Sequence, residues 1–186
     1  MVIRRKNRRA ADSVRAAEAR TRQLEAFLDD ARTFTGVSPT TVPDLRLRAD
    51  ADERVYLCIR GIYLFETLLD LTEPDGVRQH GAPTPVDLGE LAVTDRRAGF
   101  TGAKQIRQWS WSSLIGITHA ANGPWTTIDV SSRRRQFGLL YDNENREQIR
   151  FSIDLAVATA RGTRDEVIDR IAGELAHAVS ATPEAD

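Results

Sequence analysis

The sequence predicts an α+β fold with a bent antiparallel sheet in the middle of the chain and helices at both ends. From residue 91 to residue 140, short apolar stretches alternate with polar turns at regular intervals, a pattern typical of strands joined by hairpins. Before and after the sheet region, apolar residues recur at spacings of three and four, which is the period of a helix.

The N-terminal segment predicts a long amphipathic helical arm. Residues 12–35 contain neither glycine nor proline and are rich in alanine, leucine, arginine and glutamate, which favour helix. Gly36, Pro39 and Pro43 end the segment. The narrow apolar stripe along it needs a partner, which is either the same domain or a second copy of the chain. The stripe is formed by Val14, Ala17, Thr21, Leu24, Leu28 and Ala31, and it widens at Phe27 and Phe34.

Seven strands are predicted in the central region. Val55–Tyr63 is rich in valine, tyrosine and isoleucine and predicts a long first strand, with Gly61 as a bulge position. Residues 72–89 contain many glycines and prolines and predict a surface loop. The later strands are joined by links of only a few residues, and such short links favour antiparallel neighbours. These are expected at Leu91–Thr94, Ala98–Thr101, Gln105–Trp111, Leu114–His119, Trp125–Val130 and Gln136–Leu140.

Two helices are predicted after the sheet. The first has helical spacing of apolar residues from Ile149 to Ala160 and is expected to stop at Gly162 in a left-handed conformation. The second is expected to begin at Thr163-Arg164-Asp165-Glu166, which matches a capping box. Its predicted apolar face consists of Val167, Ile168, Ile171, Leu175 and Val179.

The chain is therefore expected to divide into three segments. Residues 1–45 form a basic tail and the helical arm, and residues 46–142 form the antiparallel β domain. Residues 143–182 form the C-terminal helices, which are expected to pack on the sheet.

Composition and charge exclude several classes of function. Lysine and arginine number 26 against 27 aspartate and glutamate, so any affinity for nucleic acid or anionic lipid has to be local. The most apolar window, residues 55–71, is interrupted by Arg60, Glu66 and Asp70 and predicts no transmembrane helix. The basic N-terminus is not followed by the apolar stretch of a signal peptide, and we expect a cytoplasmic protein.

The reactive residues predict neither an enzyme nor a metal or cofactor site. His80, His119 and His177 are scattered, and none lies near the Gly-x-Ser-x-Gly turn of a hydrolase. The single cysteine, Cys58, lies in an apolar run and is expected to be a buried small hydrophobe, so zinc ligands are lacking. The carboxylates at 50–53 and 142–147 lack the glycine turn of a calcium loop and are expected to be solvated caps and turns.

Two basic runs remain as candidate binding residues. Arg4, Arg5, Lys6, Arg8 and Arg9 are suited to phosphates of anionic lipid or nucleic acid, and the alternative is a solvated tail. A predicted hairpin turn carries three cations that either grip a phosphate or keep the turn soluble and the sheet edge unpaired. These are Arg133, Arg134 and Arg135.

A tryptophan pair is the third candidate. Trp109 and Trp111 are two residues apart on one predicted strand, so both are expected on the same side of the sheet, together with Arg107. Such a pair either stacks bases and lines a groove, or belongs to the packing of the core.

The first hairpin resembles that of bacterial PH-like (GRAM-like) domains. The residues Leu91-Ala92-Val93-Thr94-Asp95-Arg96-Arg97 are similar to the Leu-x-Val-Thr-[Asn/Asp]-x-Arg pattern of that family. A basic turn with Phe100, Gly102 and Lys104 follows, and then a strand that ends in Trp109-Ser110-Trp111-Ser112-Ser113-Leu114. The sequence departs from the commonest form at Asp95 and at Gly99. The resemblance covers about residues 54–160.

This resemblance implies a strongly bent antiparallel sheet or partly open barrel, closed by a C-terminal helix. It also implies a scaffold without catalysis that binds peptides, proteins or lipid head groups, an analogy of fold only. In lipid-binding members the head group lies over a loop rich in lysine and arginine, and Arg96, Arg97 and Lys104 are the matching candidates here.

The leading hypothesis is a non-catalytic intracellular interaction module that recognises a protein partner or forms a homo-oligomer through its helical arm. The alternative is an electrostatic binder of nucleic acid or anionic membrane through the arginine-rich N-terminus.

Overall fold

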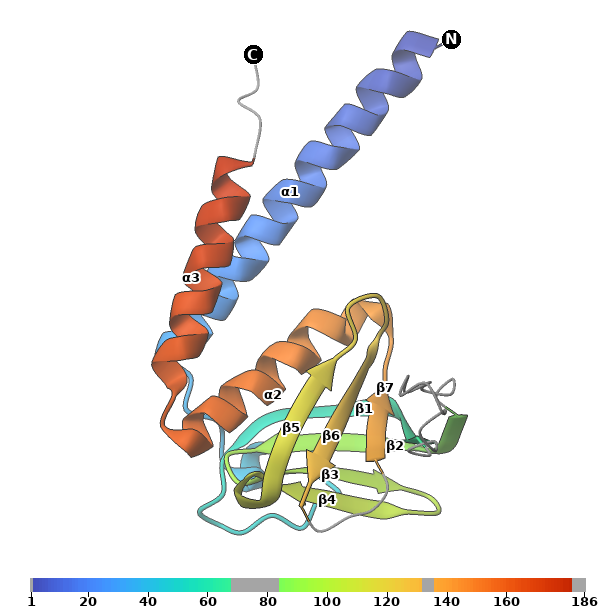
Figure 1. Cartoon of the computed structure of the whole chain (residues 1–186), viewed down its shortest axis with the longest axis vertical. Coiled ribbons are helices and arrows are strands. Elements are labelled where there is room, and N and C mark those ends of the chain that lie inside the picture. Colours follow the sequence, from blue (N-terminus) through green and yellow to red (C-terminus); the bar gives the residue numbers. More distant parts are fainter. Residues whose placement is uncertain (1, 68–83, 132–135, 182–186) are drawn as a thin grey trace, which may run out of the picture. The chain divides into compact units, whose positions relative to one another are not determined.

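A computed structural model describes residues 2–67, 84–131 and 136–181. For residues 2–11, 67 and 136 it describes the backbone alone. The chain forms two compact units. One comprises residues 1–34 and 161–186, and the other comprises residues 35–160. The predicted α+β class is confirmed, with an antiparallel sheet and helices at both ends of the chain (Figure 1).

The smaller unit is a pair of helices, α1 (Val2–Thr33) and α3 (Arg164–Ser180), which pack against each other (Figure 1). The predicted arm begins at Val2, so the backbone of the basic run 4–9 belongs to the helix and not to a separate tail. Helix α3 packs on α1 within this unit, and the expected packing of the segment 143–182 on the sheet stays a prediction for α3. The buried residues of the pair are Leu24, Phe27, Leu28 and Ala31 on α1, and Val167 and Ile171 on α3.

Arg164 at the start of α3 holds the end of α1. Its Nε donates to the carbonyl of Ala31 at 2.5 Å, and its Nη2 donates to the carbonyls of Asp30 at 3.1 Å and Phe34 at 2.5 Å. The last carbonyls of a helix lack partners inside the helix, and Arg164 donates to two carbonyls of the last turn, Asp30 and Ala31, and to Phe34 just after it. The helix begins where the capping box was predicted, but the box itself is not formed, because the Thr163 hydroxyl does not cap it.

The larger unit contains one seven-stranded sheet in which every pairing is antiparallel. Its strand order is β4-β3-β2-β1-β7-β6-β5. The strands are β1 (Val55–Thr67), β2 (Thr84–Thr94), β3 (Arg97–Gly102), β4 (Ile106–Ser110), β5 (Leu114–His119), β6 (Trp125–Val130) and β7 (Gln136–Leu140).

Two boundaries differ from the prediction. The predicted loop 72–89 extends too far along the chain, because β2 begins at Thr84 and pairs with the end of β1. Residues 72–83 of that loop lie outside the described residues. Trp111 is not in a strand, since it begins a short 3-10 helix, Trp111–Ser113, that turns the chain from β4 into β5.

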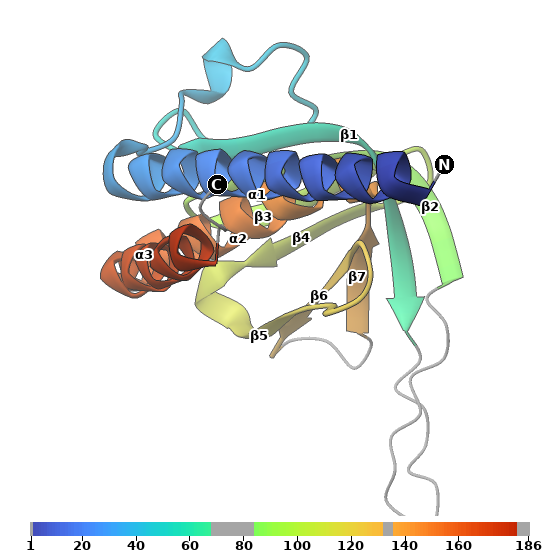
Figure 2. The same cartoon turned by 90° about the horizontal axis from the view of Figure 1, so that it is seen from above.

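The sheet curls back on itself, as predicted for a partly open barrel. Gly61 has a φ of 81° and interrupts the register of β1 and β2, which bends the long strand as predicted. The Arg107 guanidinium of β4 lies 5.0 Å from the ring centroid of Phe137 in β7, although three strands separate β4 from β7 in the sheet. Residues of β4 also lie close to residues of β6, and the open seam lies between the edge strands β4 and β5 (Figure 2).

Helix α2 (Arg146–Arg161) follows β7 and lies against the sheet (Figure 1). Its buried face includes Ile149, Phe151, Ile153 and Leu155. Helix α2 is followed by Gly162, which has a φ of 70° as the sequence predicts. Glycine adopts this left-handed conformation at a helix end because it has no Cβ that would clash. The core of this unit lies between α2 and the concave face of the sheet.

Gly99 in β3 provides space for a side chain that precedes the sheet. Leu47 is buried, and a Cβ built on Gly99 lies 2.5 Å from its Cδ1 atom. The glycine therefore lets the segment before β1 pack directly on the sheet.

We expect Gly99→Ala to lower the free energy of unfolding by about 1–3 kcal/mol, because the added methyl overpacks the Leu47 contact. Urea unfolding followed by fluorescence measures this change. Gly116→Ala in β5 is the matched control, since no atom lies within 4 Å of its added Cβ. Equal stability of the two variants would show that Leu47 yields without cost.

Candidate functional site

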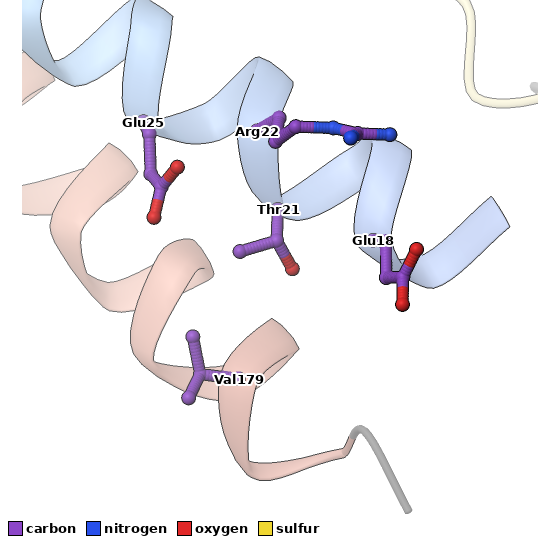
Figure 3. A pocket seen from close by; sticks show the side chains of 5 residues that line it. All are labelled: Glu18, Thr21, Arg22, Glu25 and Val179. Atoms are coloured by element: carbon purple, nitrogen blue, oxygen red, sulfur yellow. The ribbon is translucent and has the colours of Figure 1, made fainter. Parts of the chain in front are cut away.

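A hollow of about 390 Å³ lies between α1 and α3. It is lined by Glu18, Thr21, Arg22 and Glu25 from α1 and by Val179 from α3 (Figure 3). Figure 3 shows Thr21 and Val179 between the two helices, with the side chains of Glu18 and Glu25 on either side of Thr21 along α1. The hollow thus has a small apolar floor and a charged rim.

The hollow exists because the two helices separate toward their free ends (Figure 1). Leu24 and Leu28 are buried near the closed end, whereas Ala17 and Thr21 are half-buried. On α3 the exposure rises in the same direction, and the side chain of Val179 is 56% exposed. The predicted apolar stripe of the arm is therefore covered along one half only.

An ion pair joins the helices beside the hollow. Arg20 of α1 donates to Glu174 of α3 at 3.2 Å, and Arg170 donates to the other oxygen of Glu174 at 3.2 Å. These groups are partly exposed, so the pair orients the helices more than it stabilises them. The rim of the hollow also carries the carboxylates of Glu18 and Glu25 and the guanidinium of Arg22.

The arginines of the β2–β3 hairpin are held by acidic side chains. Arg97 donates through Nε to Glu53 Oε1 at 3.0 Å and through Nη2 to Oε2 at 2.9 Å. Arg96 contacts Asp50 at 3.3 Å and Asp52 at 2.5 Å. The two cations predicted for a lipid head group are therefore engaged within the chain.

Glu53 is the buried centre of this arrangement, with 0% exposure. The Thr94 hydroxyl donates to its Oε1 at 2.6 Å, and the amide of Asp50 donates to its Oε2 at 3.0 Å. Burial alone raises the pKa of Glu53, but the hydrogen bonds from Arg97 and Thr94 outweigh burial and lower the pKa. The expectation of a solvated cap is wrong for Glu53 but fits the exposed Asp50, Asp52, Asp142 and Glu144. The hydrogen bond from Arg96 lowers the pKa of Asp52.

Asp95 at the turn of the hairpin pairs with the residue before β1. Its Oδ1 accepts from the amide of Arg54 at 2.9 Å, and its own amide donates to the carbonyl of Arg54 at 2.9 Å. This role needs only an acceptor oxygen, which asparagine also has. Asp95 thus ties the hairpin to the residue before β1 through two backbone contacts.

Lys104 lies in the exposed turn between β3 and β4. Its amide and that of Gln105 each donate to Asp87 Oδ2 at 2.8 Å, and the amide of Leu88 donates to Oδ1 at 2.9 Å. Burial raises the pKa of Asp87, but these hydrogen bonds outweigh it and lower the pKa. The backbone of the turn is thus fixed, and its lysine is held apart from Arg96 and Arg97, which bind acidic partners.

Both tryptophans of the predicted pair are core residues. Trp109 is 1% exposed, and Trp111 is 4% exposed and donates through Nε1 to the carbonyl of Thr94 at 2.8 Å. Of the two alternatives for this pair, packing in the core is what the structure shows. Arg107 shares the inner face of β4 with Trp109, as predicted.

Both predicted basic runs fall outside the residues whose side chains the structure describes. The side chains of Arg4, Arg5, Lys6, Arg8 and Arg9 lie outside the described residues. The same holds for Arg133, Arg134 and Arg135 in the link between β6 and β7.

A chain of hydrogen bonds joins His119 to helix α2. Its Nε2 lies 3.0 Å from Asp154 Oδ1 and its Nδ1 lies 2.8 Å from Thr126 Oγ1. The Thr126 hydroxyl lies 2.8 Å from the Tyr141 hydroxyl, which accepts from Arg150 at 3.3 Å. The carboxylate, imidazole and hydroxyl stand in the order of a hydrolase triad. Thr126 is 0% exposed, however, so its oxygen cannot meet a substrate, and the chain anchors α2.

Glu90 is another buried carboxylate that the sequence pattern did not reveal. It accepts from the amide of Arg46 at 2.8 Å and from Arg60 Nε at 3.3 Å. Burial and, after it, the neighbouring Glu90 raise the pKa of the Cys58 thiol to about 11. Cys58 is half-buried and is therefore a protonated thiol at neutral pH.

Within the described ranges, no group of three or more histidine, cysteine or acidic residues is arranged to hold a metal ion. The helices of the described part of the chain also include none that is long and apolar enough to cross a bilayer.

No family model and no curated protein matches the chain. Among solved structures, it is similar to inner membrane complex sub-compartment protein 3 from Toxoplasma gondii, with 13% identity and a TM-score of 0.25 over 59% of this chain and 75% of that chain. It is also similar to an SsgA-like sporulation-specific cell division protein from Thermobifida fusca, with 17% identity and a TM-score of 0.28 over 65% and 96%. At these values the two structures say nothing about what this chain binds.

We expect Glu53→Gln to lower the free energy of unfolding at neutral pH by about 3 kcal/mol, because Arg97 loses its buried carboxylate. The folded-state pKa of Glu53 is lowered, so the pair contributes fully above the pKa of an unfolded glutamate. That contribution is lost as the pH falls through the folded-state value. The difference between the two proteins, measured by urea unfolding at several pH values, should shrink in acid.

Asp52→Asn is the control for this substitution. Its partner Arg96 is exposed, so solvent screens the pair and the variant should lose little stability. A Glu53→Gln variant no less stable than Asp52→Asn would contradict the role of Glu53.

Proposed function

We propose that this chain is a non-catalytic interaction module on a PH-like scaffold, and that its helical arm recognises another protein, in the first instance a second copy of the chain. The single observation that carries the proposal is the uncovered half of the apolar stripe beside the hollow between α1 and α3. The meander of strands followed by the packed helix α2 supports the scaffold, because that arrangement is what the PH-like resemblance implies.

The lengths of the helices leave room for a further helix. Helix α1 has 32 residues and helix α3 has 17, which correspond to about 48 Å and about 25 Å at 1.5 Å per residue. Because α3 covers only about half of α1, the stripe positions Val14, Ala17 and Thr21 lie where coverage ends. A half-covered stripe favours association with a second amphipathic helix.

Charge favours a second copy as the occupant. The first eleven residues contain five cations and no acidic residue, whereas Glu18 and Glu25 stand on the rim of the hollow. An antiparallel pairing of two α1 helices brings the basic end of each helix toward these carboxylates of the other. Such a pairing is isologous and closes as a dimer.

The alternative, electrostatic binding of nucleic acid or anionic membrane, is less well supported. Trp109 and Trp111 are buried, and Arg96 and Arg97 are paired with acidic side chains. That alternative rests on the basic run at the N-terminus alone. It predicts binding to DNA or anionic vesicles that weakens steeply with salt.

We expect Ala17→Glu to weaken self-association by about tenfold or more, because it places a charge on the apolar stripe of both copies. Light scattering over a range of concentrations measures the dissociation constant. Ala16→Glu is the matched control, since Ala16 is exposed and lies beside the stripe.

A wild-type chain that stays monomeric at all concentrations would contradict the second copy as partner. The same conclusion would follow if Ala16→Glu and Ala17→Glu weakened association equally, because a general charge effect would then explain both.

A further inference from the structure

Four charged residues form one line along α1 beside the hollow. They are Arg15, Glu18, Arg22 and Glu25, and all four are exposed. Their spacings of three, four and three residues place them on one face of the helix, because residues three or four apart are neighbours on a helix surface. The last three of them line the hollow (Figure 3). Basic and acidic side chains therefore alternate along this charged line.

The charged line is not used by contacts within the part of the chain that the structure describes. Among these residues, the side chains of Glu18, Arg22 and Glu25 form neither an ion pair nor a hydrogen bond. Arg15 lies 4.0 Å from Asp12, and its side chain is 78% exposed. A row of alternating charges without partners is suited to meeting charges on another helix.

The charged line lies on a different side of α1 from the contact with α3. Arg20, which pairs with α3 at 3.2 Å, is two residues from both Glu18 and Arg22, and residues two apart on a helix do not face the same way. Helix α3 therefore leaves the charged line open. Between the two helices, Thr21 and Val179 give the hollow its apolar floor.

The order of the charges is self-complementary when two copies of the helix run in opposite directions. From one end the line is basic, acidic, basic, acidic, and from the other end it is acidic, basic, acidic, basic. An antiparallel pair of α1 helices with its twofold axis at position 20 places Arg15 opposite Glu25 and Glu18 opposite Arg22. Each pair occurs twice, because such a dimer is symmetric. A parallel pair instead brings each charge level with its own copy, where like charges repel.

We infer that the charged line fixes the orientation and register of self-association, so that two α1 helices pair antiparallel about position 20 and lie over each other's hollow. This inference rests on the proposed function and deepens it by naming the residues that meet. Exposed ion pairs contribute little affinity, so the apolar floor supplies stability and the charges select one alignment among several. The basic first eleven residues of each helix then extend past Glu25 of the other copy.

Charge exchange tests whether Glu18 meets Arg22. In Glu18→Arg, two like-charged contacts replace two ion pairs of the dimer, so the dissociation constant should rise about tenfold or more at low salt. Arg22→Glu should act in the same way. The double variant Glu18→Arg/Arg22→Glu again places opposite charges together, so its dissociation constant should return to within about threefold of wild type. Light scattering over a range of concentrations measures all four proteins.

The matched control for Glu18→Arg is Asp169→Arg, which changes the net charge equally at an exposed residue of α3. Its dissociation constant should stay within about threefold of wild type, because Asp169 lies outside the charged line.

A distance between two spin labels tests the orientation. The label is attached to Arg32→Cys in a Cys58→Ser background, since Cys58 is the single native cysteine. In the antiparallel pair, position 32 of one helix stands opposite position 8 of the other. Double electron–electron resonance should then give about 36 Å at 1.5 Å per residue, whereas a parallel pair brings the labels within about 20 Å.

The outcomes separate the inference from the proposed function. A dimer with labels within about 20 Å would overturn the antiparallel register and leave self-association of the arm in place. A double variant as weak as the single variants would show that Glu18 and Arg22 do not meet. Equal weakening by Asp169→Arg would reduce the effect to net charge. A wild-type chain that stays monomeric would remove the proposed partner and the register together.

Discussion

The segment before β1 and the β2–β3 hairpin both depend on the hydrogen bonds of the buried Glu53 carboxylate. It accepts from Thr94, from the amide of Asp50 and from both nitrogens of the Arg97 fork. These bonds hold the segment before β1 against the β2–β3 hairpin, with Leu47 seated over Gly99. An uncompensated charge would be costly at such a depth, so the segment and the hairpin have to form together.

This interaction also changes the meaning of the hairpin motif. The Thr-Asp-Arg-Arg sequence looks like a presentation of cations to a ligand, yet each of its polar groups bonds to the segment at 50–54. The buried carboxylates of Asp87 and Glu90 likewise accept hydrogen bonds from groups within the chain.

The sequence was sufficient for the type and order of the elements, because period and turn residues report local backbone preference. It failed at the start of β2, where Pro85 and Gly89 look like breakers although β1 is long enough to pair with them. It also failed for Glu53, whose partner Arg97 is 44 residues away, since spacing along the chain carries no information about such pairs. Trp111 was assigned to β4 because a 3-10 turn leaves no periodic signal of its own.

The candidate site was only partly predictable for the same reason. The stripe on the arm was visible as spacings of three and four, but where α3 stops covering it depends on a packing partner from the opposite end of the sequence. Likewise, the position of Arg107 on the inner face followed from alternation, whereas its contact with the Phe137 ring depends on how the sheet curls.

Arg164 makes the two ends of the polypeptide interdependent. It satisfies the terminal carbonyls of a helix that was made more than a hundred residues earlier, with a sequence separation of 133 from Ala31. During synthesis, the final turn of α1 and its leucines therefore stay exposed to water until α3 has been made. Shortening either terminus leaves the other with bare apolar surface, so this helix pair is gained or lost as a whole.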